Sequence, residues 1–208
     1  MTDPERRVRG SCPIMTDRPP PAARFSPDPR RPYLGRAHAT GPDGAVLLKS
    51  YDLTAWSGTG TWRRRVRDRC ALIEQVTGGR TRFRWEGDRL IRVSTPMIGM
   101  RRLPGAVPLS RAGFAEIHDL LDRAHLTGLT HGDLTPRNVV TDGSRADLID
   151  WEPILVGPGP APAEDPAPER VTDPTRWLGG CDLLRLAPRD APVSRLDLIG
   201  LNRLRRVA

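Results

Sequence analysis

Cysteine is scarce in this sequence, and its placement argues against two structural uses of the residue. The 208-residue chain has three cysteines, Cys12, Cys70 and Cys181, which lie far apart. An odd and scattered set provides neither a disulfide framework nor the paired spacing of a zinc site. We therefore expect neither in this protein.

Long apolar runs are also missing. No stretch approaches the roughly 18 apolar residues of a membrane-spanning helix, and the residues after Met1 lack the apolar segment of a signal peptide. We therefore expect a cytoplasmic protein with no membrane span. Hydrophobic residues make up 38% of the chain and aromatic residues 5%. That composition is adequate for one domain, or for two small lobes that share a cleft.

Lysine is almost absent, although the chain is basic. Of the 33 basic residues all but Lys49 are arginine, and the formal net charge is +8. Abundant Arg, Ala, Gly and Pro are typical of G+C-rich coding, so nucleic-acid binding is an alternative that rests on charge alone. Arginine cannot replace lysine where a compact ammonium must act as a point charge. Lys49 is therefore a candidate for a specific function, and chance survival of one lysine codon is the alternative.

The composition changes after residue 32. Residues 1–32 are rich in Pro, Arg and Asp, which predicts a disordered leader, and Met15 offers a second start. Beyond it, the spacing of apolar residues and turn signals predicts both strands and helices, which makes the fold class α+β. The expected elements are strands at 33–40, 45–51, 82–85, 90–93, 138–140 and 146–150, and helices at 62–76, 110–125, 177–186 and 193–207.

The densest group of chemically active side chains lies between residues 130 and 152. Asp133, Asn138 and Asp150 place oxygen atoms in a loop and at the ends of two paired strands. Oxygen ligands of this kind suit Mg²⁺, which keeps several waters and bridges substrate phosphates. Phosphoryl transfer needs a carboxylate for the attacking hydroxyl, a metal ion and a cation on the phosphates. Lys49, on an upstream strand, can supply that cation.

These residues form a recognisable pair of motifs. His131-Gly132-Asp133, with Asn138 five residues after Asp133, and then Ile149-Asp150-Trp151-Glu152, resemble the catalytic loop and the metal-binding motif of kinase-like phosphotransferases. The His-Gly-Asp form resembles aminoglycoside and choline-type kinases, lipopolysaccharide-core sugar kinases and the minimal kinase of the tRNA-threonylcarbamoylation complex. The resemblance implies a two-lobed protein-kinase-like fold, with a reduced N-lobe sheet plus one helix at 33–102 and a truncated, mainly helical C-lobe at 103–208.

The resemblance also implies roles for the catalytic and metal-binding residues. Asp133 would be the catalytic base, and Asn138 and Asp150 would hold Mg²⁺. Lys49 would contact the α- and β-phosphates of ATP. The implied activity is an ATP- and Mg²⁺-dependent kinase that transfers the γ-phosphate to a hydroxyl of a protein Ser/Thr or of a small molecule.

Further residues would bind the nucleotide. Val140 would form part of the adenine floor, and Met100 would lie in a hinge at 98–101 whose backbone pairs with adenine. An acid in the 62–76 helix would pair with Lys49. Asp68 is favoured for that role by its spacing, and Glu74 is the alternative.

Three more residues have expected structural roles. Asp197 resembles the buried helix aspartate that braces the catalytic loop, although it could be an ordinary exposed acid. His131 is expected to be a structural residue that forms hydrogen bonds with the loop backbone, rather than a proton carrier in catalysis. Trp151 is expected to pack in the core beside the metal site.

Two departures from the kinase pattern leave a second function open. No Gly-x-Gly-x-x-Gly precedes Lys49, so the loop that covers the phosphates is short or missing, and the second lobe that the resemblance implies is truncated. The alternative is therefore a nucleotide-binding pseudokinase or regulatory module without turnover.

Overall fold

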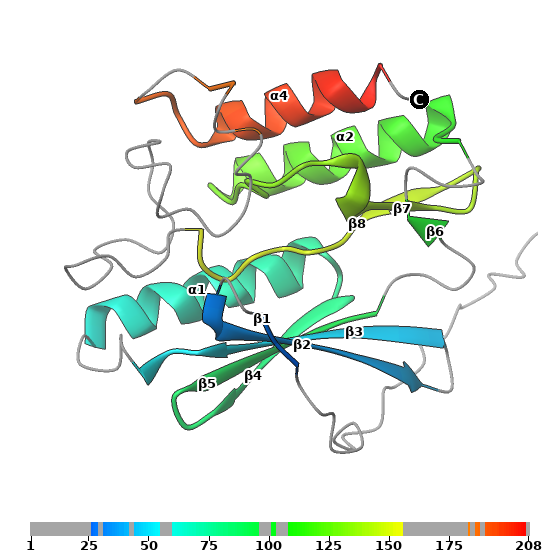
Figure 1. Cartoon of the computed structure of the whole chain (residues 1–208). Helices are drawn as coiled ribbons and strands as arrows, with labels where there is room; N and C mark the ends of the chain where they lie inside the picture. Colours follow the sequence, from blue (N-terminus) through cyan, green and yellow to red (C-terminus); the bar gives the residue numbers. More distant parts are fainter. Residues whose placement is uncertain are drawn as a thin grey trace, which may run out of the picture.

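The structure is a computed structural model that describes residues 26–28, 31–41, 44–54, 60–95, 101–102, 108–155, 183, 186–187 and 190–206. Side chains are described from residue 47 onward, except at 101–102. These residues form an α+β fold of small antiparallel sheets and helices, as the sequence predicts (Figure 1).

The larger sheet has five strands in the described part of the chain. Their order across the sheet is β1-β2-β3-β5-β4, and every neighbouring pair is antiparallel. Gly87, at φ 60°, provides the left-handed turn between β4 and β5. The strands are β1 (Ser26–Asp28), β2 (Arg31–Gly41), β3 (Gly44–Asp52), β4 (Thr81–Glu86) and β5 (Arg89–Ser94).

The prediction of a disordered leader at 1–32 is wrong at its C-terminal end. Ser26–Asp28 and the first residues of β2 are paired strands. The pairing satisfies backbone groups that composition alone leaves to solvent, and Pro27 is tolerated because β1 is an edge strand. Residues 1–25 lie outside the described part of the chain.

Helix α1 (Gly60–Val76) covers one face of this sheet (Figure 1). Apolar side chains at helical spacing, such as Val66, Cys70 and Ile73, are buried. The helix is followed by Gly78 and Gly79, both at positive φ, and the Gly79 amide donates to the carbonyl of Glu74 at 2.8 Å. The prediction of a helix that ends at 76 is therefore confirmed.

The rest of the described chain forms a smaller sheet with helices on it. The antiparallel strands β6 (Arg101–Arg102), β7 (Val139–Thr141) and β8 (Ala146–Leu148) pair in that order. Helix α2 (Arg111–Leu126) lies between this sheet and helix α4 (Ser194–Leu204) (Figure 1). Ser110 caps α2 by accepting a bond from the Gly113 amide at 3.0 Å.

Some sequence expectations for this half differ from the structure. The helix expected at 110–125 extends to Leu126, whose side chain is 87% exposed at the end of α2. The strand expected at 146–150 ends at Leu148, because Asp150 has φ 71° and leaves the extended conformation. Apart from Leu183, which is helical, and the turn residue Leu186, the helix expected at 177–186 lies outside the described residues.

Candidate functional site

The loop that carries Asp133 and Asn138 is held in shape by its own side chains. Residues Pro136–Asn138 form a turn of 3-10 helix that leads into β7. The Asn138 amide group donates to the carbonyl of Asp133 at 2.8 Å and to its Oδ2 at 3.0 Å. Asn138 is buried and Asp133 half-buried. The NH₂ group is thus used inside the loop, and the amide oxygen of Asn138 remains as a ligand atom.

Asp197 braces this loop from α4. Its carboxylate is fully buried and accepts the backbone amides of His131 at 2.9 Å and Gly132 at 2.8 Å. Gly132 has φ 81°, a conformation that favours glycine, and this directs its amide toward Asp197. The expectation of a buried helix aspartate is confirmed, and the exposed alternative is wrong.

His131 joins the loop to the segment after β8. Its Nδ1 accepts the amide of Asp133 at 3.3 Å, so Nε2 carries the hydrogen and donates to the Ile149 carbonyl at 3.0 Å. The ring lies edge-on to Trp151, with centroids 4.6 Å apart. Both ring nitrogens are occupied by the backbone, which confirms a structural histidine. Trp151 is fully buried in the core, as expected.

Lys49 and Asp150 form an ion pair between β3 and the segment after β8. The Lys49 Nζ lies 2.5 Å from Asp150 Oδ1, and Arg92 from β5 pairs with the same oxygen. Burial by itself raises the pKa of Asp150, but the charges of Arg92 and Lys49 outweigh it and hold that pKa well below its ordinary value. Asp150 is therefore ionised, and its side chain remains 26% exposed.

Glu152 is the second carboxylate of this cluster. Its Oε1 pairs with Lys49 and lies 3.5 Å from Arg92, while its Oε2 accepts the hydroxyl of Tyr51 at 2.5 Å. Burial raises the pKa of Tyr51 well above its ordinary value, against the lowering effect of Arg92, so the hydroxyl keeps its proton. Two cations and two carboxylates thus balance one another in a buried network.

Sequence reasoning did not find Arg92, although a signal exists. Arg92 interrupts the apolar run of Leu90, Ile91 and Val93, and it is 2% exposed. It lies directly opposite Lys49 in the β3–β5 register. Two cations at opposed positions repel each other, so this pairing requires the carboxylates of Asp150 and Glu152 between them.

A second buried arginine, Arg69 of α1, was also not predicted. Its Nε donates to the carbonyl of Glu152 at 2.9 Å, and its Nη2 donates to the carbonyl of Thr130 at 2.7 Å. Arg69 is 5% exposed. One side chain thus ties α1 to the ends of both motif segments.

The expected helix partner of Lys49 is corrected. Asp68 has a side chain 69% exposed and lies 4.0 Å from Arg64 on the outer face of α1. The alternative, Glu74, accepts the amide of Phe83 at 2.7 Å. Spacing along the chain did not reveal that Arg69, and not its acidic neighbour, faces the site.

The two expected adenine contacts have different outcomes. Val140 is buried in β7, where it is paired with Asp147 of β8 and Arg102 of β6. Met100 and hinge residues 98–100 lie outside the described residues, and residue 101 begins β6.

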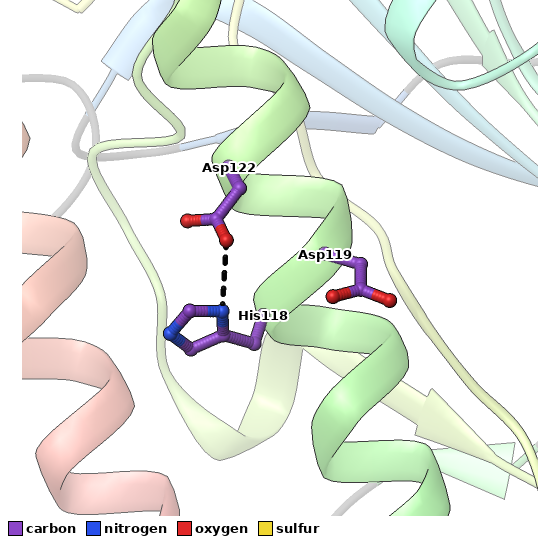
Figure 2. Close-up of side chains that lie close together, drawn as sticks. All are labelled: His118, Asp119 and Asp122. Carbon is purple, nitrogen blue, oxygen red and sulfur yellow. Dashed lines mark ion pairs between the residues drawn. The ribbon is translucent and has the colours of Figure 1, made fainter.

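A group of three potential ligands lies elsewhere, on α2. His118, Asp119 and Asp122 are all exposed, and the His118 Nδ1 pairs with Asp122 Oδ2 at 3.0 Å one turn away (Figure 2). Exposed groups of this kind are common without a metal ion. None of the three contributes to the Lys49 network.

Comparison with known proteins adds no assignment. No family model matches the chain, and no curated protein matches its sequence. Within the described residues, no helix combines the length and the apolar character needed to cross a membrane.

Proposed function

We propose that this protein is an ATP- and Mg²⁺-dependent phosphotransferase of the kinase-like type. It transfers the γ-phosphate to a hydroxyl of a protein Ser/Thr or of a small molecule. The observation that supports this most is the ion pair between Lys49, the only lysine of the chain, and Asp150 of the Ile-Asp-Trp-Glu motif. Those are the two residues that kinase chemistry requires at one site, as phosphate cation and metal ligand.

The proposal includes a two-lobed fold. The five-stranded sheet with α1 would be the N-lobe, expected at 33–102 and extended by β1 to Ser26. The smaller sheet with α2 and α4 would be the C-lobe, expected at 103–208, and β6 at 101–102 also belongs to that sheet. The order of elements supports this, because a strand pair, a helix and a hairpin precede a helix, a catalytic loop and a second hairpin. The segment after β8 crosses between the two parts (Figure 1). Substrate would bind where they meet.

The residues present fit a magnesium ion. Asn138 uses its NH₂ group within the loop, which leaves Oδ1 as a ligand. Among the described contacts of Asp150, both cations reach Oδ1, which leaves Oδ2. Carboxylate and amide oxygens are suitable Mg²⁺ ligands. When bound with ATP, the ion would neutralise charge that develops on the phosphates.

In this mechanism Asp133 would accept the proton of the acceptor hydroxyl, whose oxygen forms the new bond to the γ-phosphorus as the bond from that phosphorus to the β–γ bridging oxygen breaks and ADP leaves. The Asn138 amide holds Oδ2 of Asp133 at 3.0 Å and so orients the carboxylate. Lys49 places its ammonium on the phosphates as a compact charge, and Val140 contributes to the adenine floor.

A pseudokinase is the second candidate. It is favoured by Asp150 already having two cations as partners and by the missing glycine motif before Lys49.

Two measurements test the proposal. Mg²⁺ with ATP should raise the melting temperature, because a ligand that binds only the folded state stabilises it. Transfer of labelled phosphate, first to the protein itself and then to general protein and aminoglycoside acceptors, separates the candidates. Binding without transfer identifies the pseudokinase, and an unchanged melting curve at saturating ATP rejects both candidates.

A further inference from the structure

The environment of Glu152 points to a function that differs from that of Asp150. Among the described contacts, both carboxylate oxygens of Glu152 have protein partners: Oε1 has Lys49 and Oε2 has Tyr51. The carbonyl oxygen of Glu152 accepts Arg69. A metal ion at this carboxylate would therefore compete with those partners. Asp150 is more exposed, at 26% of its side chain against 7% for Glu152, and its cations share one oxygen.

We propose that Glu152 is the positioning residue of Lys49, and that Arg69 fixes Glu152 in the place where it does so. The proposal rests on the proposed function to the extent that Lys49 is the phosphate-binding cation. Glu152 thus performs the task that a carboxylate of α1 was expected to perform.

Helix α1 supports the assignment of Glu152, in place of Asp68, as the carboxylate partner of Lys49. The acid favoured from the sequence, Asp68, is on the exposed face of the helix and pairs with Arg64. The next residue, Arg69, is on the buried face. Helix α1 therefore presents a cation toward the site, and that cation reaches the backbone rather than Lys49. The carboxylate for Lys49 comes from the segment after β8.

Arginine is suited to this position. Its planar group carries several donors in a fixed geometry, so that Nε and Nη2 can reach two different carbonyls, Glu152 at 2.9 Å and Thr130 at 2.7 Å. Thr130 immediately precedes the catalytic loop. The two bonds tie α1 to both motif segments. Lys49 can therefore be held by Glu152 while α1 stays in the position that it has in this structure, and no movement of α1 is needed to bring an acidic side chain to Lys49.

The test uses the fact that Lys49 is the only lysine. Its amine can be followed alone, by acetic anhydride labelling and peptide mass spectrometry, without nucleotide. The isosteric change Glu152→Gln should increase the acylation rate of Lys49 by about tenfold, because a buried ion-pair partner is lost. Arg69→Gln should increase it by a smaller factor. Arg69→Lys, which keeps the charge but cannot form both bonds, should lie between Arg69→Gln and wild type.

Three controls match these variants in chemistry. Asp68→Asn, Glu86→Gln and Arg64→Gln should leave the acylation rate of Lys49 unchanged, since these side chains are exposed and the ion pairs that they form among the described residues do not include Lys49. Circular dichroism establishes that each variant is folded. If Asp68→Asn accelerates labelling of Lys49 and Glu152→Gln does not, the proposal that Glu152 positions Lys49 is overturned.

A second readout separates positioning from metal binding. In Glu152→Gln the stabilisation by Mg²⁺ alone should match that of wild type, whereas Asp150→Asn should lose it. Equal loss in both variants makes Glu152 a metal ligand and overturns the proposal. If wild type shows no shift with Mg²⁺ and ATP, the phosphotransferase proposal fails, and the labelling rates still decide whether Glu152 positions Lys49.

Discussion

Asp197 and His125 are joined by a short polar contact: Nε2 of His125 lies 2.9 Å from Oδ2 of Asp197. The hydrogen bond to Asp197 is the largest influence on His125 and raises its pKa above the ordinary value, while burial opposes it. The same Asp197 carboxylate accepts the amides of His131 and Gly132. The ionisation of a histidine outside the loop is therefore linked to the bracing of the loop that carries Asp133.

This link predicts a pH-dependent stability. A histidine with a raised folded-state pKa stabilises the fold fully below its unfolded pKa of about 6.5, and the contribution disappears as pH rises through the folded pKa. The difference in unfolding free energy between wild type and His125→Gln should be larger at about pH 6 than at about pH 9. Urea unfolding measures it. A difference that does not change with pH contradicts the prediction.

Replacing Gly200 with alanine should destabilise the protein. A Cβ at Gly200 would lie 2.4 Å from the carbonyl oxygen of Leu134 in the loop that follows His131. Overpacking of this kind costs about 1–3 kcal/mol, whereas Gly to Ala inside a helix otherwise stabilises by about 1 kcal/mol. The sign of the change in unfolding free energy is therefore decisive. Asn202→Ala, at an exposed position of the same helix, should be neutral or stabilising.

Asp150→Asn should have two effects. The Mg²⁺-dependent part of the ATP-induced rise in melting temperature should vanish, because the amide lacks the charge of the carboxylate. The melting temperature without ligand should also fall, since Lys49 and Arg92 keep only Glu152 between them. Asp122→Asn removes an exposed carboxylate and is the control. A retained Mg²⁺ effect would exclude Asp150 as the ligand.

Asp133→Ala should reduce phosphoryl transfer by roughly a hundredfold or more, as expected for loss of a positioned base. Nucleotide binding should survive, since the proposed metal ligands are Asn138 and Asp150. Labelled-phosphate transfer and the melting temperature with Mg²⁺ and ATP measure the two quantities. Equal transfer by wild type and variant would reject Asp133 as the base while leaving the class of enzyme open.

Lys49→Arg should impair turnover although it keeps the charge. The guanidinium is broader than an ammonium and cannot reproduce a point charge on the phosphates. It would also have to fit between Asp150 and Glu152 in a buried network. The measurement is the transfer rate at saturating ATP, with Arg64→Lys on the exposed face of α1 as the reciprocal control. Full activity of Lys49→Arg would contradict a specific function for the lysine.

Much of the fold could be predicted because its signals are local. Apolar residues at helical spacing located α1 and α2. Ser110 marked the start of α2, and Gly78–Gly79 marked the end of α1. Turn residues located the β2–β3 and β4–β5 hairpins of the larger sheet. The leader was misjudged because the pairing of β1 with β2 provides hydrogen bonds that composition does not reveal.

Part of the candidate site could be predicted for the same reason. Asp133 and Asn138 lie five residues apart in one loop, and their hydrogen bond is local. Arg92 was missed although it interrupts the apolar run of β5. Arg69 was missed because a buried arginine has no distinctive sequence pattern in a chain with this many arginines. The prediction of Asp68 as the helix partner of Lys49 was wrong because the adjacent residues Asp68 and Arg69 lie on different faces of α1, one exposed and one buried.

The sequence by itself determined the α+β elements, the two motifs and the special position of Lys49, since these follow from periodicity, turn chemistry and residue identity along the chain. Only the tertiary structure decided which charges meet. The β3–β5 register places Arg92 opposite Lys49, and the segment after β8 brings Asp150 and Glu152 between them. Ion pairs between residues so far apart in the sequence depend on strand register and on which face a helix turns to the site. A shift of one residue in either would place different side chains in the site.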